Sequence, residues 1–333
     1  MSYSDPTMKE HIRRILSRAS GTIAIALLSV AFLVPARAAD AQQKVKVRLL
    51  TSQTTAALPF LYMAKEQTVP GVDLQIQFFA NHAQALATLL RGDVELLYTG
   101  SSQGWQNRMD GSPIVMIDTG IWGMSSLIGK DPSIKGFADL RGKKISMPFP
   151  GSPLDFQSRA LLAHENIDPD KDLTISFGPF PQSVQRLLAG QLDAAALPEP
   201  LATTVVRKNG LVRLVEYSKA WARLTGGDPQ SPQVSLFAGS TYASSHSALI
   251  AAVVKAWSAA TQRVTASPET AAARFAVDLA VDQGILEEAT RNTILSVPAP
   301  AENRDRVISY FKTVFPYLPA GSKQIDETYF FIP

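Results

Sequence analysis

The chain has 333 residues, of which 46% are hydrophobic and 18% charged, and its formal net charge is +3. This length is sufficient for a large hydrophobic core or for two domains of ordinary size. Five of the 32 Lys and Arg residues and two of the 29 Asp and Glu residues lie in residues 1–38, so the rest of the chain is formally neutral. Because nucleic acids and anionic membranes require a basic surface, we expect neither as a partner. The chain has no cysteine, which excludes disulfides, thiolate metal ligands and cysteine nucleophiles.

Residues 1–38 have the order of a secretory signal peptide. The basic region at its start contains Lys9, Arg13, Arg14 and Arg18. An apolar run over 23–34 follows, and then the small residues Ala36 and Ala38. This run is shorter than the roughly 20 residues that span a bilayer. We therefore expect cleavage after Ala38 or Ala39 and export to the periplasm, by general secretion or, given Arg13-Arg14, by the twin-arginine route.

From Lys44 onward, short apolar strands alternate with helical patterns, which predicts an α/β architecture with largely parallel strands. In the first part of the chain, strands are expected at 45–50, 73–79, 94–98 and 114–118, and a helix at 56–67. A second helix is expected after Asn81, because Asn81 and Gln84 form a capping-box pattern. Gly92 is placed to end that helix in the left-handed conformation.

A faint internal repeat indicates two related lobes. Leu89–Glu95 matches Leu187–Asp193 at a constant offset of 98 residues, which follows from their numbers. Each copy reads as a helix end, a Gly stop and a short strand that begins with an acid. The surrounding pattern repeats as well, with strands expected at 173–177 and 194–197 and a helix from Gln182. We therefore expect lobe 1 to contain residues 44–125 and 236–333, and lobe 2 to contain residues 126–235.

The second half of the chain is expected to return to lobe 1. Strand 145–147 and a helix that starts at Ser152 open lobe 2, and strand 234–238 leads back. Residues 244–312 are predicted to be helical, with breaks at Ser267-Pro268, near Gly284 and at 298–300. The two connections, 120–130 and 230–239, are expected to act as a hinge.

Several fragments in this order resemble a known family. They are Asp139–Ile145 with Gly151-Ser152, Leu188–Ala196 and Pro198–Pro200. The chain is similar to the substrate-binding proteins of ABC importers of the nitrate/sulfonate/taurine type. The resemblance covers essentially the whole chain after the signal and implies a type II periplasmic-binding-protein-like fold. It also implies a monomer that closes on a small molecule and passes it to an ABC permease in the inner membrane. The chain departs from the family at 66–71 and 81–83, in two ligand loops, so the ligand class is not carried over.

Candidate ligand-binding residues follow from the rule that ligands lie beyond the carboxyl ends of strands in open α/β sheets. Five loops qualify, at 51–57, 80–83, 99–104, 148–155 and 179–183. With the crossover residue Trp122, they provide the predicted site residues Ser52, Gln53, Thr54, Thr55, Asn81, His82, Thr99, Ser101, Ser102, Trp122, Phe149, Gly151, Ser152, Asp155, Phe180 and Gln182. None of these loops contains Lys or Arg. An anionic ligand would depend on backbone N–H groups and neutral donors, which suits a weakly hydrated monoanion better than phosphate.

Three of these residues have two interpretations. Asp155 either caps the helix that begins after Ser152 or accepts a hydrogen bond from an amino group of the ligand. The second interpretation suits a heteroaromatic compound such as a pyrimidine vitamin precursor, on which Phe149 would stack. Trp122 either lines the cleft or packs in the core. His82 either donates to the ligand or is solvated.

No pattern in the sequence indicates catalysis. The histidines lack metal-binding spacing, and the Gly-x-Ser-x-Gly elbow and the phosphate-binding Gly-rich loop are absent from the sequence. We therefore expect no enzyme activity, no metal and no cofactor. A ligand-sensing ectodomain stays open as an alternative because one fold serves both roles. An enzyme similar to the pyrimidine synthase of thiamine biosynthesis is less favoured. That synthase resembles enzymes with clustered cysteines and a cytosolic location, whereas this chain has no cysteine and is expected to be exported.

Overall fold

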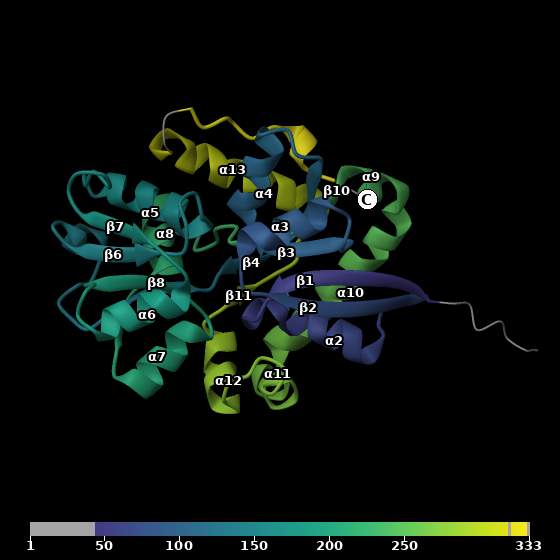
Figure 1. Cartoon of the computed structure of the whole chain (residues 1–333), viewed down its shortest axis with the longest axis horizontal. Helices are drawn as coiled ribbons and strands as arrows, with labels where there is room; N and C mark the ends of the chain where they lie inside the picture. The colour runs from purple at the N-terminus through teal and green to yellow at the C-terminus, as the bar shows by residue number, and fades with distance from the viewer. Residues whose placement is uncertain (1–43, 319–320, 332–333) are drawn as a thin grey trace, which may run out of the picture. The chain divides into compact units, whose positions relative to one another are not determined.

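The computed structural model describes residues 44–318 and 321–331 and confirms the α/β class (Figure 1). It contains two mixed sheets, sheet A and sheet B, with flanking helices. The predicted signal peptide and its cleavage site lie outside the described residues. Within those residues, every helix is too short or too polar to serve as a membrane span.

Sheet A has the strand order β11-β4-β10-β3-β1-β2. Its strands are β1 (Val45–Ser52), β2 (Val72–Phe79), β3 (Leu96–Gly100), β4 (Ile114–Gly123), β10 (Val234–Gly239) and β11 (Ile294–Leu295). β1 is parallel to β2 and β3, whereas β10 is antiparallel to β3 and β4, and β11 to β4. The helical segments of this part are η1 (Thr55–Ala57), α2 (Leu58–Glu66), α3 (His82–Leu90) and α4 (Ser101–Met109). The strands and helices predicted up to residue 118 are confirmed.

Sheet B has the strand order β7-β6-β8-β5-β9. Its strands are β5 (Ser125–Gly129), β6 (Lys144–Met147), β7 (Thr174–Phe177), β8 (Ala194–Pro198) and β9 (Val212–Glu216). β6 is parallel to β7 and β8, whereas β5 is antiparallel to β8 and β9. Its helices are η2 (Phe137–Leu140), α5 (Pro153–His164), α6 (Phe180–Leu188), α7 (Leu201–Asn209) and α8 (Tyr217–Thr225). β5 and β9 are not among the strands predicted from the sequence.

The internal repeat corresponds to equivalent elements in the two sheets. In each sheet, the first strand of the repeat lies between the next two, as β2-β1-β3 in sheet A and as β7-β6-β8 in sheet B. The repeated acids have the same role, because Glu95 Oε2 accepts a hydrogen bond from Arg48 N (2.6 Å) and Asp193 Oδ2 accepts one from Lys144 N (2.7 Å). Gly92 and Gly190 have φ values of +77° and +72°, as the predicted helix ends require.

The chain crosses from sheet A to sheet B at Met124, the only residue between β4 and β5. It returns through the segment between α8 and β10. The two crossings are hydrogen-bonded to each other, because Gln233 Oε1 accepts from Met124 N (2.9 Å) and Gln233 N donates to the Ile121 carbonyl (2.9 Å). Most of the connection expected at 120–130 is strand, because β4 extends to Gly123 and β5 contains Ser125–Gly129. Hinge motion about these crossings stays a prediction.

The C-terminal part is mainly helical, as predicted, and packs on sheet A and on helices that flank sheet B. It contains α9 (Ser240–Ser245), α10 (Ser247–Ala266), α11 (Pro268–Phe275), α12 (Gln283–Arg291), α13 (Pro300–Val314), η3 (Phe315–Tyr317) and η4 (Glu327–Tyr329). α10 packs on α2, and α13 packs on both β4 and α5. The break expected near Gly284 lies at 276–282, just before α12, and Gly284 itself is in the first turn of that helix.

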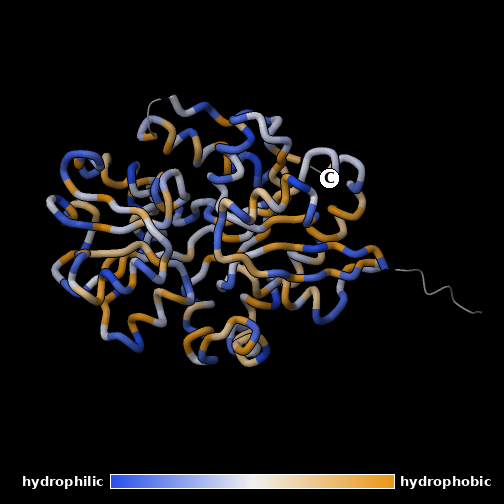
Figure 2. The backbone as a smooth tube through the Cα atoms, viewed as in Figure 1, coloured by the Kyte–Doolittle hydropathy of each residue, from blue (hydrophilic) through white to orange (hydrophobic). Residues whose placement is uncertain are grey.

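Apolar side chains connect the elements of both sheets in one core cluster, and Figure 2 shows the hydrophobic residues along the strands. The buried Trp105 ring of α4 contacts Phe156 of α5, with centroids 5.4 Å apart, and Phe311 of α13, with centroids 4.8 Å apart. Trp105 is thus a core residue. Because α13 belongs to this cluster, the C-terminal part stabilises the arrangement of both sheets.

Substituting Gly120→Ala should lower the free energy of unfolding by about 1–3 kcal/mol through overpacking. A Cβ atom at Gly120 would overlap the Trp257 ring and lie 2.5 Å from the Tyr98 hydroxyl. Urea denaturation measures the effect. Gly284→Ala is the matched control, because a Cβ there has no atom within 4 Å, and it should cause no loss. Equal stability of the two variants would contradict the close packing at Gly120.

Asp118→Asn should remove a pH dependence of stability. Asp118 is fully buried on β4, where its Oδ1 accepts from Thr119 N (2.7 Å), and its Oδ2 lacks a partner among the described residues. Burial raises the pKa of this carboxyl from 3.8 to about 8. Between these values the folded state holds a proton that the unfolded state has released. The free energy of unfolding should therefore fall as pH rises, by up to about 1.4 kcal/mol per pH unit.

Denaturation curves collected across this pH range test the prediction. The Asp118→Asn variant should be less sensitive to pH than the wild type and more stable at its alkaline end. Asp305→Asn, at a carboxylate that is 70% exposed, should retain the wild-type slope. An unchanged slope in Asp118→Asn would show that this carboxyl is not the source.

Candidate functional site

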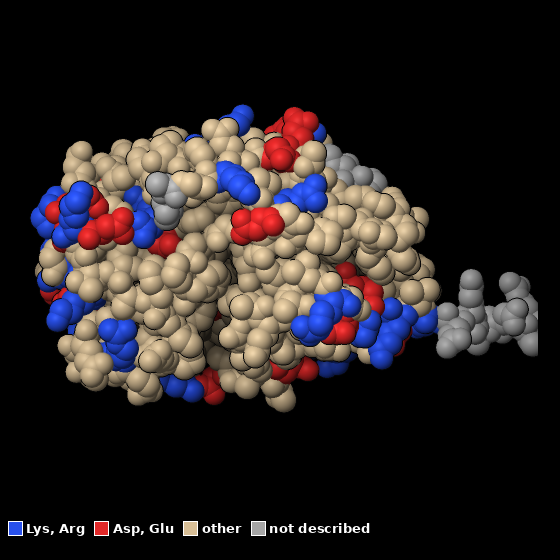
Figure 3. Space-filling view, turned by 45° about the horizontal axis from the view of Figure 1, so that its top comes forward, with Lys and Arg blue, Asp and Glu red and all other residues tan. Residues whose placement is uncertain are grey.

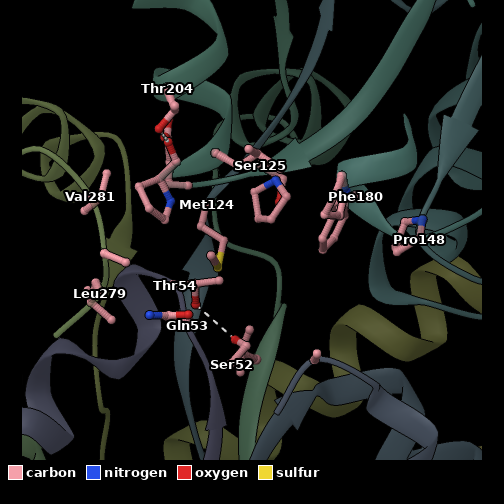
Figure 4. Close-up of a pocket in the computed structure, with 18 of the residues that line it drawn as sticks. Ser52, Gln53, Thr54, Met124, Ser125, Pro148, Phe180, Thr204, Leu279 and Val281 are labelled. Carbon is pink, nitrogen blue, oxygen red and sulfur yellow. Dashed lines mark hydrogen bonds between the residues drawn. The ribbon is translucent and has the colours of Figure 1, made fainter. Parts of the chain in front are cut away.

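A cavity of about 1060 Å³ lies at the carboxyl ends of strands from both sheets (Figure 4). From sheet A, Ser52 and Phe79 end β1 and β2, and Gly100 ends β3. From sheet B, Pro148 follows β6 and Pro198 ends β8. Both groups of parallel strands thus point their carboxyl ends at one space, as the strand-end rule predicts.

The wall on the side of sheet A begins with the loop after β1. Ser52 Oγ and Thr54 Oγ1 are hydrogen-bonded at 3.0 Å, and Thr54 also accepts from Ala56 N (3.4 Å) to cap η1. Gln53 Nε2 donates to the carbonyl of Asp278 (3.2 Å), which attaches this loop to the segment between α11 and α12. In Figure 4 Ser52 and Thr54 lie across the cavity from Ser125 and Phe180, and the Gln53 side chain runs sideways toward Leu279.

Most of the remaining wall is apolar. The apolar lining residues include Phe79, Met124, Pro148, Phe149, Leu154, Phe180, Pro198, Leu201, Val234, Val277, Leu279 and Val281. Among the described residues that line the cavity, the ionisable ones are His82, Glu199, Lys208 and Asp282. Lys208 pairs with Asp282 in an ion pair between α7 and the residue before α12. On the face shown in Figure 3, Lys and Arg are interspersed with Asp and Glu. The cavity is therefore an apolar site with few charges.

His82 stands at the start of α3, between aromatic rings of the two halves. Its ring centroid is 4.9 Å from that of Phe79 and 5.1 Å from that of Phe149. Its Nδ1 is 2.9 Å from Thr99 Oγ1. Burial lowers the pKa of His82 from 6.5 to about 4. The imidazole is therefore neutral at physiological pH, and one ring nitrogen is a hydrogen-bond acceptor.

Glu199 belongs to a buried polar network at the cavity. Its Oε1 accepts from Arg213 Nη2 (2.7 Å) and from Asn292 Nδ2 (3.3 Å), and its Oε2 accepts from Thr203 N (3.0 Å). Arg213 also donates to Ser126 Oγ (2.7 Å). Glu199 thus lines the cavity while Arg213 neutralises its charge. Asn292, which follows α12, connects the network to the C-terminal part.

The structure separates the predicted site residues into two groups. Those that line the cavity are Ser52, Gln53, Thr54, His82, Phe149, Ser152 and Phe180. Those that do not are Thr55, Asn81, Thr99, Ser101, Ser102, Trp122, Gly151, Asp155 and Gln182. Ligand contact by the first group stays a prediction. The second group bonds to other parts of the protein, with the exception of the exposed Gln182.

Several members of the second group satisfy neighbouring backbone or side-chain groups. Asn81 Oδ1 accepts from Gln84 N (3.0 Å), which is the predicted cap of α3. Thr55 and Ser101 are buried and bond to Thr293 (3.0 Å) and Ser235 (2.7 Å). Ser102 Oγ donates to the Gly151 carbonyl (2.7 Å), which connects α4 with the loop before α5.

Asp155 and Trp122 have structural contacts. The Asp155 carboxylate is 2% exposed and accepts from Gly151 N (2.7 Å) and Arg159 Nε (3.1 Å). Ser152 Oγ accepts from Asp155 N (3.1 Å), so the capping interpretation describes this helix start. Burial raises the pKa of Asp155. Trp122 is buried, and its Nε1 donates to the carbonyl of Ser296 (2.9 Å).

Sequence reasoning missed one entire part of the wall. This part runs from the end of α11 to the start of α12 and is distant in sequence from every predicted loop. Its residues that line the cavity are Ala273, Ala276, Val277, Leu279, Ala280, Val281, Asp282 and Gln283. Their small apolar residues are typical of a core helix, so the sequence carried no signal for them. Met124, Ser125 and Gln233 at the chain crossings were also missed. Among the described residues, no group of three or more His, Asp and Glu is placed to hold a metal ion.

Arg213→Met should lower the free energy of unfolding by about 3–5 kcal/mol, because it leaves the buried Glu199 carboxylate without its cation. Chemical denaturation measures this loss. Adding Glu199→Gln should restore part of the stability, since the uncompensated charge is then removed. Arg91→Met is the control, because Arg91 pairs with Asp93 at the surface, where their side chains are 61% and 54% exposed, and it should change stability by less than about 1 kcal/mol. A double variant no more stable than Arg213→Met would contradict this account.

Comparison with known proteins identifies the family. Residues 40–280 match the model of the NMT1-like family. The nitrate/nitrite binding protein NrtA of Nostoc sp. is 36% identical over 87 residues, which are 26% of this chain and 20% of that protein. NrtA of Synechococcus elongatus is 36% identical over 84 residues, 24% of this chain and 19% of that protein. These matches thus span about a fifth of the length of the curated relatives.

Solved structures of binding proteins share the fold. The alkanesulfonate-binding protein SsuA from Xanthomonas axonopodis pv. citri, bound to MOPS, has a TM-score of 0.69 at 16% identity and covers 83% of this chain and 95% of its own. The periplasmic nitrate-binding protein NrtA from Synechocystis has a TM-score of 0.69 at 14% identity and covers 84% of each chain. This likeness confirms the periplasmic-binding-protein-like fold. Because the family model matches residues 40–280, most of the sequence, the chain belongs to the NMT1-like family.

Proposed function

We propose that this chain is a periplasmic receptor that captures a small solute in its cavity and delivers it to an ABC permease in the inner membrane. The observation that carries the proposal is the cavity at the carboxyl ends of strands from both sheets. Membership of the family and the fold shared with SsuA and NrtA support it. The order of residues 1–38, typical of a signal peptide, supports export to the periplasm. In this role the protein binds without catalysis, and the relatives and solved structures reported above are named as binding proteins.

We further propose that the two sheets mark two lobes, with residues 44–125 and 236–333 in lobe 1 and residues 126–235 in lobe 2. The paired crossings near Met124 and Gln233 would then form the hinge. Contacts between α7 and α12 would hold the closed form, since Arg207 Nε lies 3.6 Å from Glu288 Oε2 and Lys208 pairs with Asp282. A ligand that touches both lobes stabilises this form by contacts that the open form lacks.

Thermal-shift screening of the exported chain tests whether it binds a small solute. The panel should contain nitrate, taurine, alkanesulfonates, pyrimidines and flavins. A ligand at 100 times its dissociation constant adds about 2.7 kcal/mol to the free energy of unfolding, so a true ligand should raise the melting temperature clearly. X-ray scattering with the same ligand should show a smaller radius of gyration. Binding without compaction would contradict closure but not receptor function.

Replacing both Arg207 and Lys208 by Met should weaken the affinity for that ligand by about two- to tenfold, because partly exposed ion pairs contribute roughly 0.2–1 kcal/mol each. Calorimetric titration measures the change. Lys219→Met is the control, since Lys219 pairs with Glu216 (2.8 Å) within the sheet B half, and it should leave affinity unchanged. Unchanged affinity in the double variant would exclude these pairs from the closed state.

A further inference from the structure

The hydrogen bonds around His82 determine which of its ring nitrogens carries the proton. Gln103 Nε2 donates to the carbonyl of His82 (2.9 Å), and a carbonyl can only accept. The amide oxygen of Gln103 therefore faces Thr99, whose hydroxyl donates its single proton to it (2.9 Å). With that proton used, Thr99 Oγ1 can only accept from His82, at 2.9 Å. Nδ1 of His82 is thus protonated, and Nε2 carries a free lone pair.

This lone pair belongs to a residue of the cavity wall. His82 lines the cavity, and its Nε2 has no hydrogen-bond partner among the residues that the structure describes. The rings that flank the imidazole, Phe79 and Phe149, offer no donor. The imidazole therefore presents an acceptor within an aromatic frame that both sheets contribute.

The rest of the wall does not favour an anion. Of the described residues that line the cavity, Lys208 is the only Lys or Arg, and it pairs with Asp282. Glu199 adds a carboxylate to the wall. The volume of about 1060 Å³ suits an organic molecule with rings rather than an ion of a few atoms.

We propose that the ligand is an uncharged, ring-bearing organic molecule whose N–H or O–H group donates a hydrogen bond to His82 Nε2, with its ring between Phe79, Phe149 and Phe180. This inference rests on the proposed receptor function and narrows its ligand class. Thr99 and Gln103 are positioning residues, because they act on the ligand through the imidazole. The low pKa of His82, about 4, keeps the acceptor unprotonated throughout the neutral range.

Three naphthalene derivatives provide the probes. 2-Naphthol has a donor, 2-methoxynaphthalene has the same ring system without a donor, and 2-naphthalenesulfonate is an anion. By calorimetric titration, the wild type should bind 2-naphthol about tenfold more tightly than 2-methoxynaphthalene, as expected for one hydrogen bond to a desolvated acceptor. The sulfonate should bind more weakly than the naphthol. The naphthol preference should be constant from about pH 8 to pH 5.5, because the Phe79, Phe149 and Thr99 side chains around the imidazole do not titrate there.

His82→Phe keeps a ring of similar shape without nitrogen atoms and should abolish the naphthol preference, while 2-methoxynaphthalene still binds. Thr99→Val removes the acceptor that fixes the tautomer and should reduce the preference in part. His246→Phe is the matched control, since His246 is exposed and does not line the cavity, and it should retain the full preference. Binding of 2-methoxynaphthalene by each variant shows that its cavity is folded.

Two kinds of result would overturn the inference. An equal preference for naphthol in the wild type and His82→Phe would remove His82 as the acceptor. Tighter binding of the sulfonate, or no binding of any naphthalene probe at millimolar concentration, would remove the ligand class. If nitrate or taurine binds in that case, the receptor function stands without this ligand class. If the complete solute panel also fails to bind, the receptor function fails as well.

Discussion

The hydrogen bond between an acid and the first strand of each repeat fixes the geometry on which the cavity depends. Glu95 binds Arg48 N at the start of β3, and Asp193 binds Lys144 N at the start of β8. These bonds set the register of the third strand on the first, and hence the level at which the carboxyl ends of β1, β3, β6 and β8 stop. Because side chains alternate along a strand, a slip by one residue would turn the side chains of the slipped strand to the opposite face. The position of the cavity thus follows from two equivalent local bonds.

The polar groups near the cavity are mostly bonded to the protein itself. Ser52 bonds to Thr54, Ser152 caps α5, and Glu199 is neutralised by Arg213. Since buried polar groups must be satisfied, these bonds are the condition for an apolar cavity of this size within the fold. They also leave few groups to orient a ligand. Selectivity for a ligand then depends on the shape of the apolar wall and on the few groups that retain an unused hydrogen-bonding position, of which the His82 imidazole is one.

Most of the fold could be predicted from the sequence because its signals are local. Apolar alternation indicated the parallel strands, and Asn81, Ser152 and Gly92 marked helix ends through bonds within a few residues. β5 and β9 were not predicted, because they are defined by antiparallel pairing between segments that are far apart in sequence. The cavity was predictable only where a wall residue follows a predicted strand. The wall between α11 and α12 is placed by α10 and α12 packing on distant elements, and no local pattern encodes that.

His82 shows why residue type alone did not settle the chemistry of the site. From the sequence it was a loop histidine, either solvated or a donor to ligand. The structure surrounds it with Phe79 and Phe149 and binds its Nδ1 to Thr99, so desolvation keeps it neutral and a chain of three side chains fixes its tautomer. Thr99 and Gln103 lie in the predicted ligand loop at 99–104, yet neither lines the cavity. Their contribution is to place the imidazole proton on Nδ1, so that Nε2 is a hydrogen-bond acceptor, whereas a donor to the ligand was the alternative considered from the sequence.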